Sequence, residues 1–160
     1  MDNIYILTGQ LGCGKTTFVY NLLKEKMNAA GIITITENEK RYLLSLHSGE
    51  KHPLEVEGNY AGEVYLIGKY VFYVSSFDWA EEQIKAIDFS KIDYFVLDEL
   101  GCLEENKFGF YNSLPEAVKK LENTNTKGIF VVRESSLSTI CSFLGVPQNI
   151  AYTKDNFPQI

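Results

Sequence analysis

The sequence predicts an α/β fold in which helices cover both faces of a mostly parallel sheet. Short apolar runs alternate with helix-like stretches along the whole chain, as in strand–helix–strand units with right-handed crossovers. Residues 4–8 and 94–97 are apolar at almost every position, which is typical of strands buried on both faces. With 160 residues, 45% of them hydrophobic, the chain has the size of a single domain spanning residues 1–160.

The first predicted strand, residues 4–8, leads into a glycine-rich loop that fits the P-loop pattern at every fixed position. Glycines let backbone N–H groups point at phosphate oxygens, and the helix that follows adds its positive dipole end. Lys15 would reach the β- and γ-phosphates, and the Thr16 hydroxyl would be a ligand of Mg²⁺. The expected nucleotide-binding residues are Gly9, Gln10, Leu11, Gly12, Cys13, Gly14, Lys15, Thr16 and Thr17.

A helix and a hairpin are expected after this loop. The helix is predicted over residues 15–30, with Met27 on its apolar stripe and Gly31 as a left-handed cap. Residues 32–36 are β-branched throughout, and residues 42–46 resume an extended, apolar pattern after a polar turn. These two runs predict an antiparallel hairpin.

The middle of the chain predicts a small antiparallel addition. Residues 47–63 mix glycines, a proline and charges, which is typical of a loop or an irregular insertion. Residues 64–67 and 70–74 read as two short strands joined by a tight turn. Asp78 stands where it would cap a helix that ends near Asp88.

Two carboxylates follow the buried strand at residues 94–97. Ligands of open α/β sheets bind at the carboxyl ends of the strands, where Asp98 and Glu99 would emerge. Asp98 would hold Mg²⁺ opposite Thr16, either directly or through another ligand of the ion, and Glu99 would orient and deprotonate the attacking water. Nucleotide binding alone does not need Glu99, so the pair predicts hydrolysis. The alternative is a pair of solvated surface acids.

The last third of the chain continues the alternation. A helical region ends near Asn123, and Pro115 either begins a new helix or kinks a longer one. A strand is predicted over residues 128–132, a helix over 137–144 and a final strand over 149–153.

Arg133 and Arg41 are the only arginines of the chain. Arg133 follows a predicted strand, so it would emerge at the same edge of the sheet as Glu99 and could stabilise the γ-phosphate. An ordinary surface salt bridge explains it equally well. Arg41 lies in the predicted hairpin, and the sequence gives less support for a role of this arginine at the phosphates.

Composition narrows the range of partners. The net charge of −6 and the pI near 5.0 oppose nucleic-acid binding. No apolar run approaches the roughly 20 residues that span a bilayer, and no basic, apolar leader opens the chain. We expect a cytoplasmic protein whose partner is a nucleoside triphosphate, and a monomer unless an arginine acts in trans.

The chain resembles the THEP-type, or cancer-related, nucleoside-triphosphatase family over most of its length. The segments that carry the resemblance are Leu7-Thr8-Gly9, Gly14-Lys15-Thr16-Thr17, Gly31, Thr36-Glu37, Gly68-Lys69-Tyr70-Val71 and Asp98-Glu99-Leu100-Gly101-Cys102-Leu103-Glu104. Cys102 stands where the family pattern has proline, and Asn156-Phe157 stands where it has Asn-Arg. The resemblance implies a three-layer, RecA-like P-loop core and Mg²⁺-dependent hydrolysis of ATP, GTP and other triphosphates. It also implies that Glu104 belongs to the site.

Three other classes of protein share the P-loop. A small-molecule kinase usually closes over its substrates with several arginines, and this chain has two in all. A GTP switch protein reads guanine with Asn-Lys-x-Asp, which neither residues 125–127 nor residues 153–155 match. A non-catalytic nucleotide-binding module would have no use for Glu99. Hydrolysis therefore remains the leading prediction, with the kinase and the binding module as alternatives.

Overall fold

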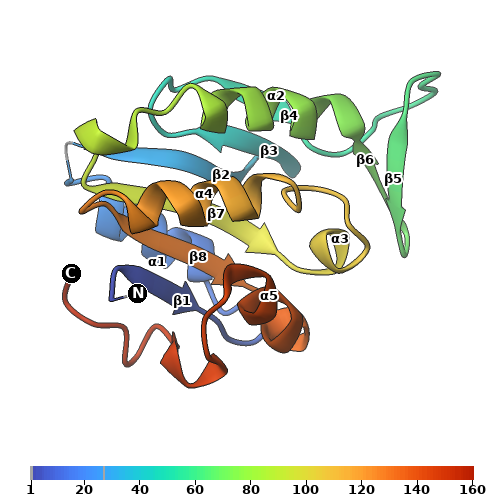
Figure 1. Cartoon of the computed structure of the whole chain (residues 1–160). Coiled ribbons are helices and arrows are strands. Elements are labelled where there is room, and N and C mark those ends of the chain that lie inside the picture. Colours follow the sequence, from blue (N-terminus) through green and yellow to red (C-terminus); the bar gives the residue numbers. More distant parts are fainter. Residues whose placement is uncertain (1, 27) are drawn as a thin grey trace.

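A seven-stranded sheet runs through the centre of the molecule in the computed structural model, which describes residues 2–26 and 28–160 (Figure 1). Its strands are β1 (Ile4–Leu7), β2 (Ala29–Glu37), β3 (Lys40–Ser45), β4 (Lys51–Pro53), β7 (Tyr94–Leu100), β8 (Lys127–Val132) and β9 (Ala151–Tyr152). Their order is β4-β3-β2-β7-β8-β1-β9. The five strands from β2 to β9 in this order are parallel, and β3 and β4 extend the β2 edge as antiparallel strands.

Helices cover both faces of this sheet, which gives the three-layer α/β fold that the sequence predicts. The helices are α1 (Lys15–Leu23), α2 (Val74–Lys85), α3 (Cys102–Glu105), α4 (Ser113–Glu122) and α5 (Leu137–Leu144), with short 3-10 turns at Phe89–Lys91, Glu134–Ser136 and Gln148–Ile150. Helix α1 packs on one face, whereas α2, α4 and α5 pack on the other (Figure 1). In β7, Val96 is buried toward α1, and Phe95 and Leu97 are buried toward the opposite helices. This two-sided burial explains why residues 94–97 are apolar throughout.

A separate two-stranded antiparallel sheet, β5 (Val64–Ile67) and β6 (Tyr70–Tyr73), stands at one end of the molecule (Figure 1). The predicted hairpin is thus confirmed. The chain passes from β6 directly into α2, so α2 begins at Val74 and the predicted start at Asp78 is wrong. The first turn of α2 is held in place because Phe77 enters the core and the Ser76 hydroxyl donates to the Pro53 carbonyl at 2.5 Å.

The predicted boundary between the first helix and the second strand is also wrong. Helix α1 ends at Leu23, and β2 already begins at Ala29, where it pairs with β7. Gly31 does not cap a helix. It lies inside β2 with φ +125°, and a Cβ there would approach the Val96 carbonyl oxygen to 2.0 Å. Sheet pairing therefore outweighs the helical pattern of these residues, and Gly31 permits the close approach. Met27, predicted on the stripe, lies outside the described residues.

Other elements follow the predictions more closely. The hairpin of β2 and β3 turns at Asn38 and Glu39, which both have positive φ. Pro115 lies in the first turn of the separate helix α4, so it begins a new helix. Residues 47–63, which are predicted to be irregular, contain the short strand β4. The final strand, predicted over residues 149–153, consists of the two residues of β9. None of the described helices is long and apolar enough to span a bilayer.

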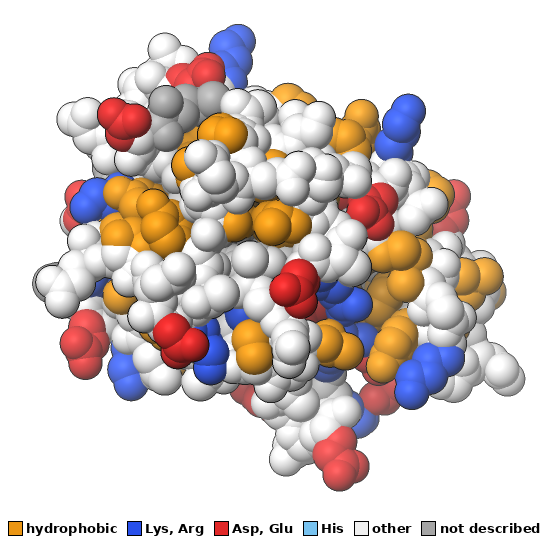
Figure 2. Space-filling view, turned by 90° about the horizontal axis from the view of Figure 1, so that it is seen from below, with side chains coloured by type: hydrophobic (Ala, Val, Ile, Leu, Met, Phe, Trp, Pro, Cys, Tyr) orange, Lys and Arg blue, Asp and Glu red, His pale blue; other side chains and the backbone are white. Residues whose placement is uncertain are grey.

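The face seen from below carries acidic and basic side chains interspersed, with apolar side chains in small separate groups (Figure 2). Mixed charges of this kind are typical of a solvated face. The residues that follow β1, β7 and β8 lie at the carboxyl ends of the parallel strands, where ligands of open α/β sheets bind.

Candidate active site

The carboxyl ends of β1, β7 and β8 deliver the glycine-rich loop, the acid pair and Arg133 to one edge of the sheet. They form a cleft of about 210 Å³ lined by Leu11, Gly12, Gly14, Lys15, Thr16, Thr17, Asp98, Glu99, Val131, Val132 and Arg133. The structure therefore brings together residues that the sequence separates by more than 80 positions. Of the predicted loop residues, Gly9, Gln10 and Cys13 are not among those that line this cleft.

The loop itself positions Lys15. Gly14 precedes α1 with φ +84°, a conformation that glycine adopts without strain, and its carbonyl accepts the first helical hydrogen bond from Phe18 at 3.0 Å. The Lys15 ammonium donates to the carbonyl oxygens of Gly9 at 2.8 Å and Gln10 at 3.0 Å. These bonds hold the ammonium over the loop, on the same side as the helix N-terminus.

Thr16 and Asp98 meet across the sheet. Thr16 lies in the first turn of α1, which follows β1, whereas Asp98 lies in β7, and β8 stands between β1 and β7. The Thr16 hydroxyl nevertheless donates to Asp98 Oδ2 at 2.6 Å, and the same oxygen accepts the Thr34 N–H at 3.1 Å. Asp98 is 1% exposed, and this burial raises its pKa to about 6.

The oxygens of Thr16 and Asp98 are hard ligands of the kind that Mg²⁺ prefers. Within residues 2–26 and 28–160, no group of three or more His, Cys, Asp or Glu side chains is arranged to hold a metal ion. A site that offers only two protein oxygens fits Mg²⁺, which is usually bound by one or two side chains together with substrate phosphates and water.

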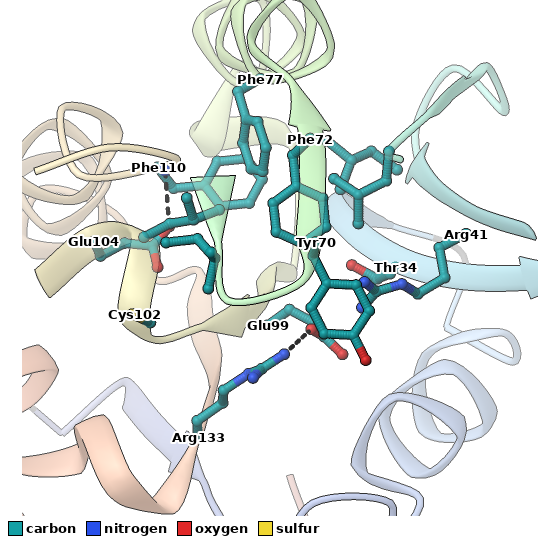
Figure 3. Close-up of a pocket in the computed structure, with 14 residues that line it drawn as sticks. Thr34, Arg41, Tyr70, Phe72, Phe77, Glu99, Cys102, Glu104, Phe110 and Arg133 are labelled. Carbon is teal, nitrogen blue, oxygen red and sulfur yellow. Dashed lines mark hydrogen bonds and ion pairs between the residues drawn. The ribbon is translucent and has the colours of Figure 1, made fainter. Parts of the chain in front are cut away.

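Glu99 is turned into the cleft by an irregularity in β7. Pairing with β8 shifts register between Leu97 and Leu100, and Glu99 takes φ +60°, a left-handed conformation that costs about 1–3 kcal/mol for a non-glycine residue. Its Oε2 lies 3.1 Å from an Arg133 guanidinium nitrogen (Figure 3). Both side chains remain about one-third exposed, at 34% and 38%. The strained backbone thus places a reachable carboxylate beside an arginine.

A second cavity, of about 50 Å³, shares Glu99 and Arg133 with the cleft and extends under the β5–β6 hairpin (Figure 3). Arg41 reaches it from β3, ion-paired with Glu55 and stacked 4.9 Å from the centre of the Tyr70 ring. From the sequence, Arg41 is only a weak candidate for the site, and Tyr70 is not a candidate. The only sequence signal for Tyr70 is its place in the segment that carries the family resemblance.

Glu104, which the resemblance places in the site, also lines this second cavity. Both of its carboxylate oxygens, however, accept hydrogen bonds from backbone N–H groups. Oε2 accepts the Gly101 N–H at 2.8 Å. Oε1 accepts the Phe110 N–H at 2.9 Å (Figure 3). The side chain is 1% exposed, and burial raises its pKa. Glu104 therefore ties the end of β7 to the loop before α4.

Glu104→Ala is expected to lower the free energy of unfolding by about 2–4 kcal/mol, because it leaves two buried N–H groups without acceptors. Urea unfolding measures the difference. The neighbouring Glu105 is exposed, so Glu105→Ala serves as the control and should change stability by less than about 0.5 kcal/mol. Equal stability of the two variants would contradict the structural role.

Comparisons with known proteins point to one family. The family model described as NTPase matches residues 4–151. The nucleoside-triphosphatase THEP1 of Thermotoga maritima is 28% identical over 137 residues, which cover 82% of this chain and 74% of that protein.

Two solved structures share the fold. THEP1 from Aquifex aeolicus superposes with a TM-score of 0.70 at 19% identity, over 94% of this chain and 87% of that one. A human cancer-related nucleoside triphosphatase superposes with a TM-score of 0.61 at 22% identity, over 82% and 76% of the two chains. At these identities the superpositions establish the three-layer fold alone.

Proposed function

The chain belongs to the NTPase family, and on this premise we propose that it hydrolyses nucleoside triphosphates, ATP and GTP among them, to diphosphate and phosphate with Mg²⁺. The observation that carries the proposal is the Thr16–Asp98 contact of 2.6 Å, with Glu99 next to it in the cleft that Lys15 lines. This arrangement supports phosphate binding, metal binding and water activation within one cleft.

The loop residues Gly9 to Thr17 bind the phosphates in this proposal. Their backbone N–H groups surround the phosphate chain, and Lys15 bonds to the β- and γ-phosphate oxygens. Thr16 and Asp98 hold the Mg²⁺, which neutralises charge on those oxygens when it is bound. Asp98 is oriented for this role by the Thr34 N–H and by its own contact with Thr16.

Glu99 acts as the general base. Its carboxylate accepts a proton from the water that attacks the γ-phosphorus, and Arg133 stabilises the charge that develops on the γ-phosphate. The pairing of Arg133 with Glu99 supports both roles, because it brings the cation and the carboxylate to one point of the cleft. Catalytic roles are therefore assigned to Lys15, Glu99 and Arg133.

The size of the cavity beside Glu99 favours water over an organic acceptor. A pocket that binds a small organic molecule usually has a volume of about 300–1,000 Å³. A cavity of only about 10–15 Å³ is enough to hold one water molecule. At about 50 Å³, the cavity that Glu99 shares with Arg41 suits a few water molecules. This favours hydrolysis over transfer of the phosphoryl group to a small-molecule substrate.

Arg133→Ala is expected to lower kcat about tenfold, the loss of one charge-assisted hydrogen bond in the transition state. Arg133→Lys should recover part of that loss because the positive charge is retained. Steady-state phosphate release from ATP measures both. An unchanged kcat for Arg133→Ala would leave Arg133 as a structural partner of Glu99.

Phosphate release from ATP, GTP, CTP and UTP tests the proposal as a whole. The expected result is release that requires Mg²⁺ and stops when EDTA removes it, with similar rates for all four bases. Absence of Mg²⁺-dependent release from every nucleotide would overturn the proposal. Transfer of the γ-phosphate to an added alcohol, with little release to water, would favour the kinase alternative.

A further inference from the structure

Lys154 lies beside the phosphate loop although it is far from it in sequence. Strand β9 pairs with β1 in parallel, with Tyr152 opposite Leu7, and the Thr8 N–H donates to the Tyr152 carbonyl at 2.8 Å. The chain that follows β9 therefore leaves the sheet at the same edge as the loop that follows β1. This edge is the one at which ligands of such sheets bind.

The turn after β9 is fixed on both sides of Lys154. The Asn156 side-chain oxygen accepts the Thr153 N–H at 2.7 Å and the Thr153 hydroxyl at 3.1 Å. The Phe157 ring then packs against an aromatic group, with centroid distances of 6.1 Å to Tyr5, 5.6 Å to Phe18 and 5.8 Å to Tyr152. The short segment between these anchors holds Lys154 against the loop.

The Lys154 ammonium lies 3.7 Å from the place that a Cβ of Gly14 would occupy. Gly14 is the residue from which α1 starts, so the ammonium sits near a helix N-terminus and near a second lysine, Lys15. Among residues 2–26 and 28–160, no carboxylate pairs with Lys154 within 4 Å. A cation beside the N-terminus of α1, next to the residue that precedes Lys15, forms an arrangement that an anion would stabilise.

The sheet order indicates which part of the nucleotide would lie at Lys154. The acid pair and Arg133 follow β7 and β8, on one side of β1, and Lys154 follows β9 on the other side. If the γ-phosphate lies toward Glu99, the phosphate chain runs across the loop toward β9. The α-phosphate is then the group nearest to Lys154.

From this geometry we propose that Lys154 is a further phosphate-binding residue, which donates to the α-phosphate of the bound nucleotide. The inference rests on the proposed nucleotide site. It adds a contact common to triphosphates and diphosphates, whereas Arg133 acts on the γ-phosphate alone. Lys154 would therefore strengthen the binding of substrate and product alike.

Lys154→Ala is expected to raise the Kd of ATP and of ADP by the same factor of about ten, the value of one charge-assisted hydrogen bond. Lys154→Gln should lose as much as Lys154→Ala, and Lys154→Arg should stay within about threefold of the original protein because its charge is kept. Calorimetric titration of the full chain with each nucleotide, in Mg²⁺, measures the Kd values of the original protein and of each variant. Lys24→Ala, which removes an exposed charge at the far end of α1, is the matched control and should bind as the original protein does.

Three results would overturn the proposal. They are unchanged Kd values for both nucleotides, a loss confined to ATP, and losses that differ between ADP, GDP and CDP. The second would place Lys154 at the γ-phosphate, and the third would place it at the base. Binding of ADP involves no hydrolysis, so failure of the proposed activity would show as tight ADP binding without phosphate release.

Discussion

Lys15→Ala is expected to weaken ATP binding by about two to four orders of magnitude. The variant loses the charge-assisted bonds to the β- and γ-phosphates, each of which contributes about 1.5–3 kcal/mol. The loop already holds the Lys15 ammonium at 2.8 Å from the Gly9 carbonyl oxygen and 3.0 Å from the Gln10 carbonyl oxygen. The lysine side chain therefore loses little further conformational freedom when ATP binds. Calorimetric titration with ATP in Mg²⁺ measures the loss.

The control for this variant is Lys24→Ala, which removes the same charge from an exposed position on the helix that Lys15 begins. It should bind ATP as the original protein does. Equal affinity of Lys15→Ala and Lys24→Ala would contradict the assignment of the phosphate loop itself, whatever the outcome for catalysis.

Glu99→Gln is expected to keep ATP binding and to lose about two orders of magnitude or more in kcat, the usual size of a general-base effect. Glutamine has nearly the same shape as glutamate and can still meet Arg133, but its amide does not accept a proton from water. The change therefore separates binding from chemistry, which a deletion of the side chain would not do.

Single-turnover phosphate release, with enzyme in excess over ATP, measures this loss without interference from product release. Glu105→Gln is the matched control, because Glu105 is an exposed glutamate six positions later and lines neither cavity. Turnover by Glu99→Gln equal to that of Glu105→Gln would remove Glu99 from the role of base. The strain at its φ of +60° would then need another explanation.

The parts of the site that a local pattern encodes could be predicted from the sequence. The phosphate loop is eight consecutive residues between a strand and a helix, and Asp98-Glu99 directly follows a buried strand. Both patterns are short enough to be read without knowing what lies opposite them in the sheet. Arg133 could be placed at the same edge for the same reason, because it ends a strand.

Features that depend on contacts between distant segments could not be predicted. Gly31 has the position of a helix cap in the sequence, yet it is glycine because β2 approaches the Val96 backbone of β7. The bond from the Thr34 N–H to Asp98 depends on the pairing of β2 with β7. Likewise, the approach of Lys154 to Gly14 depends on the pairing of β9 with β1.

Glu104 shows that a sequence motif does not reveal the role of a side chain. The family resemblance implies that Glu104 belongs to the site, but a motif match does not say whether a carboxylate faces substrate or backbone. The structure shows both of its oxygens bonded to N–H groups of Gly101 and Phe110. A buried acid with two backbone donors is explained by the local fold, so its presence in a motif needs no catalytic role.

In the proposed reaction, water activated at Glu99 attacks the γ-phosphorus of a nucleoside triphosphate. Turnover of ATP with Mg²⁺ in water enriched in the heavy oxygen isotope, with mass spectrometry of both products, locates the attacked phosphorus. We expect one heavy oxygen atom in each released phosphate and none in the ADP. Heavy oxygen in the ADP would contradict the proposed reaction, because the attack would then have occurred at the β-phosphorus, and so would a failure to form labelled phosphate faster than the Glu99→Gln variant does.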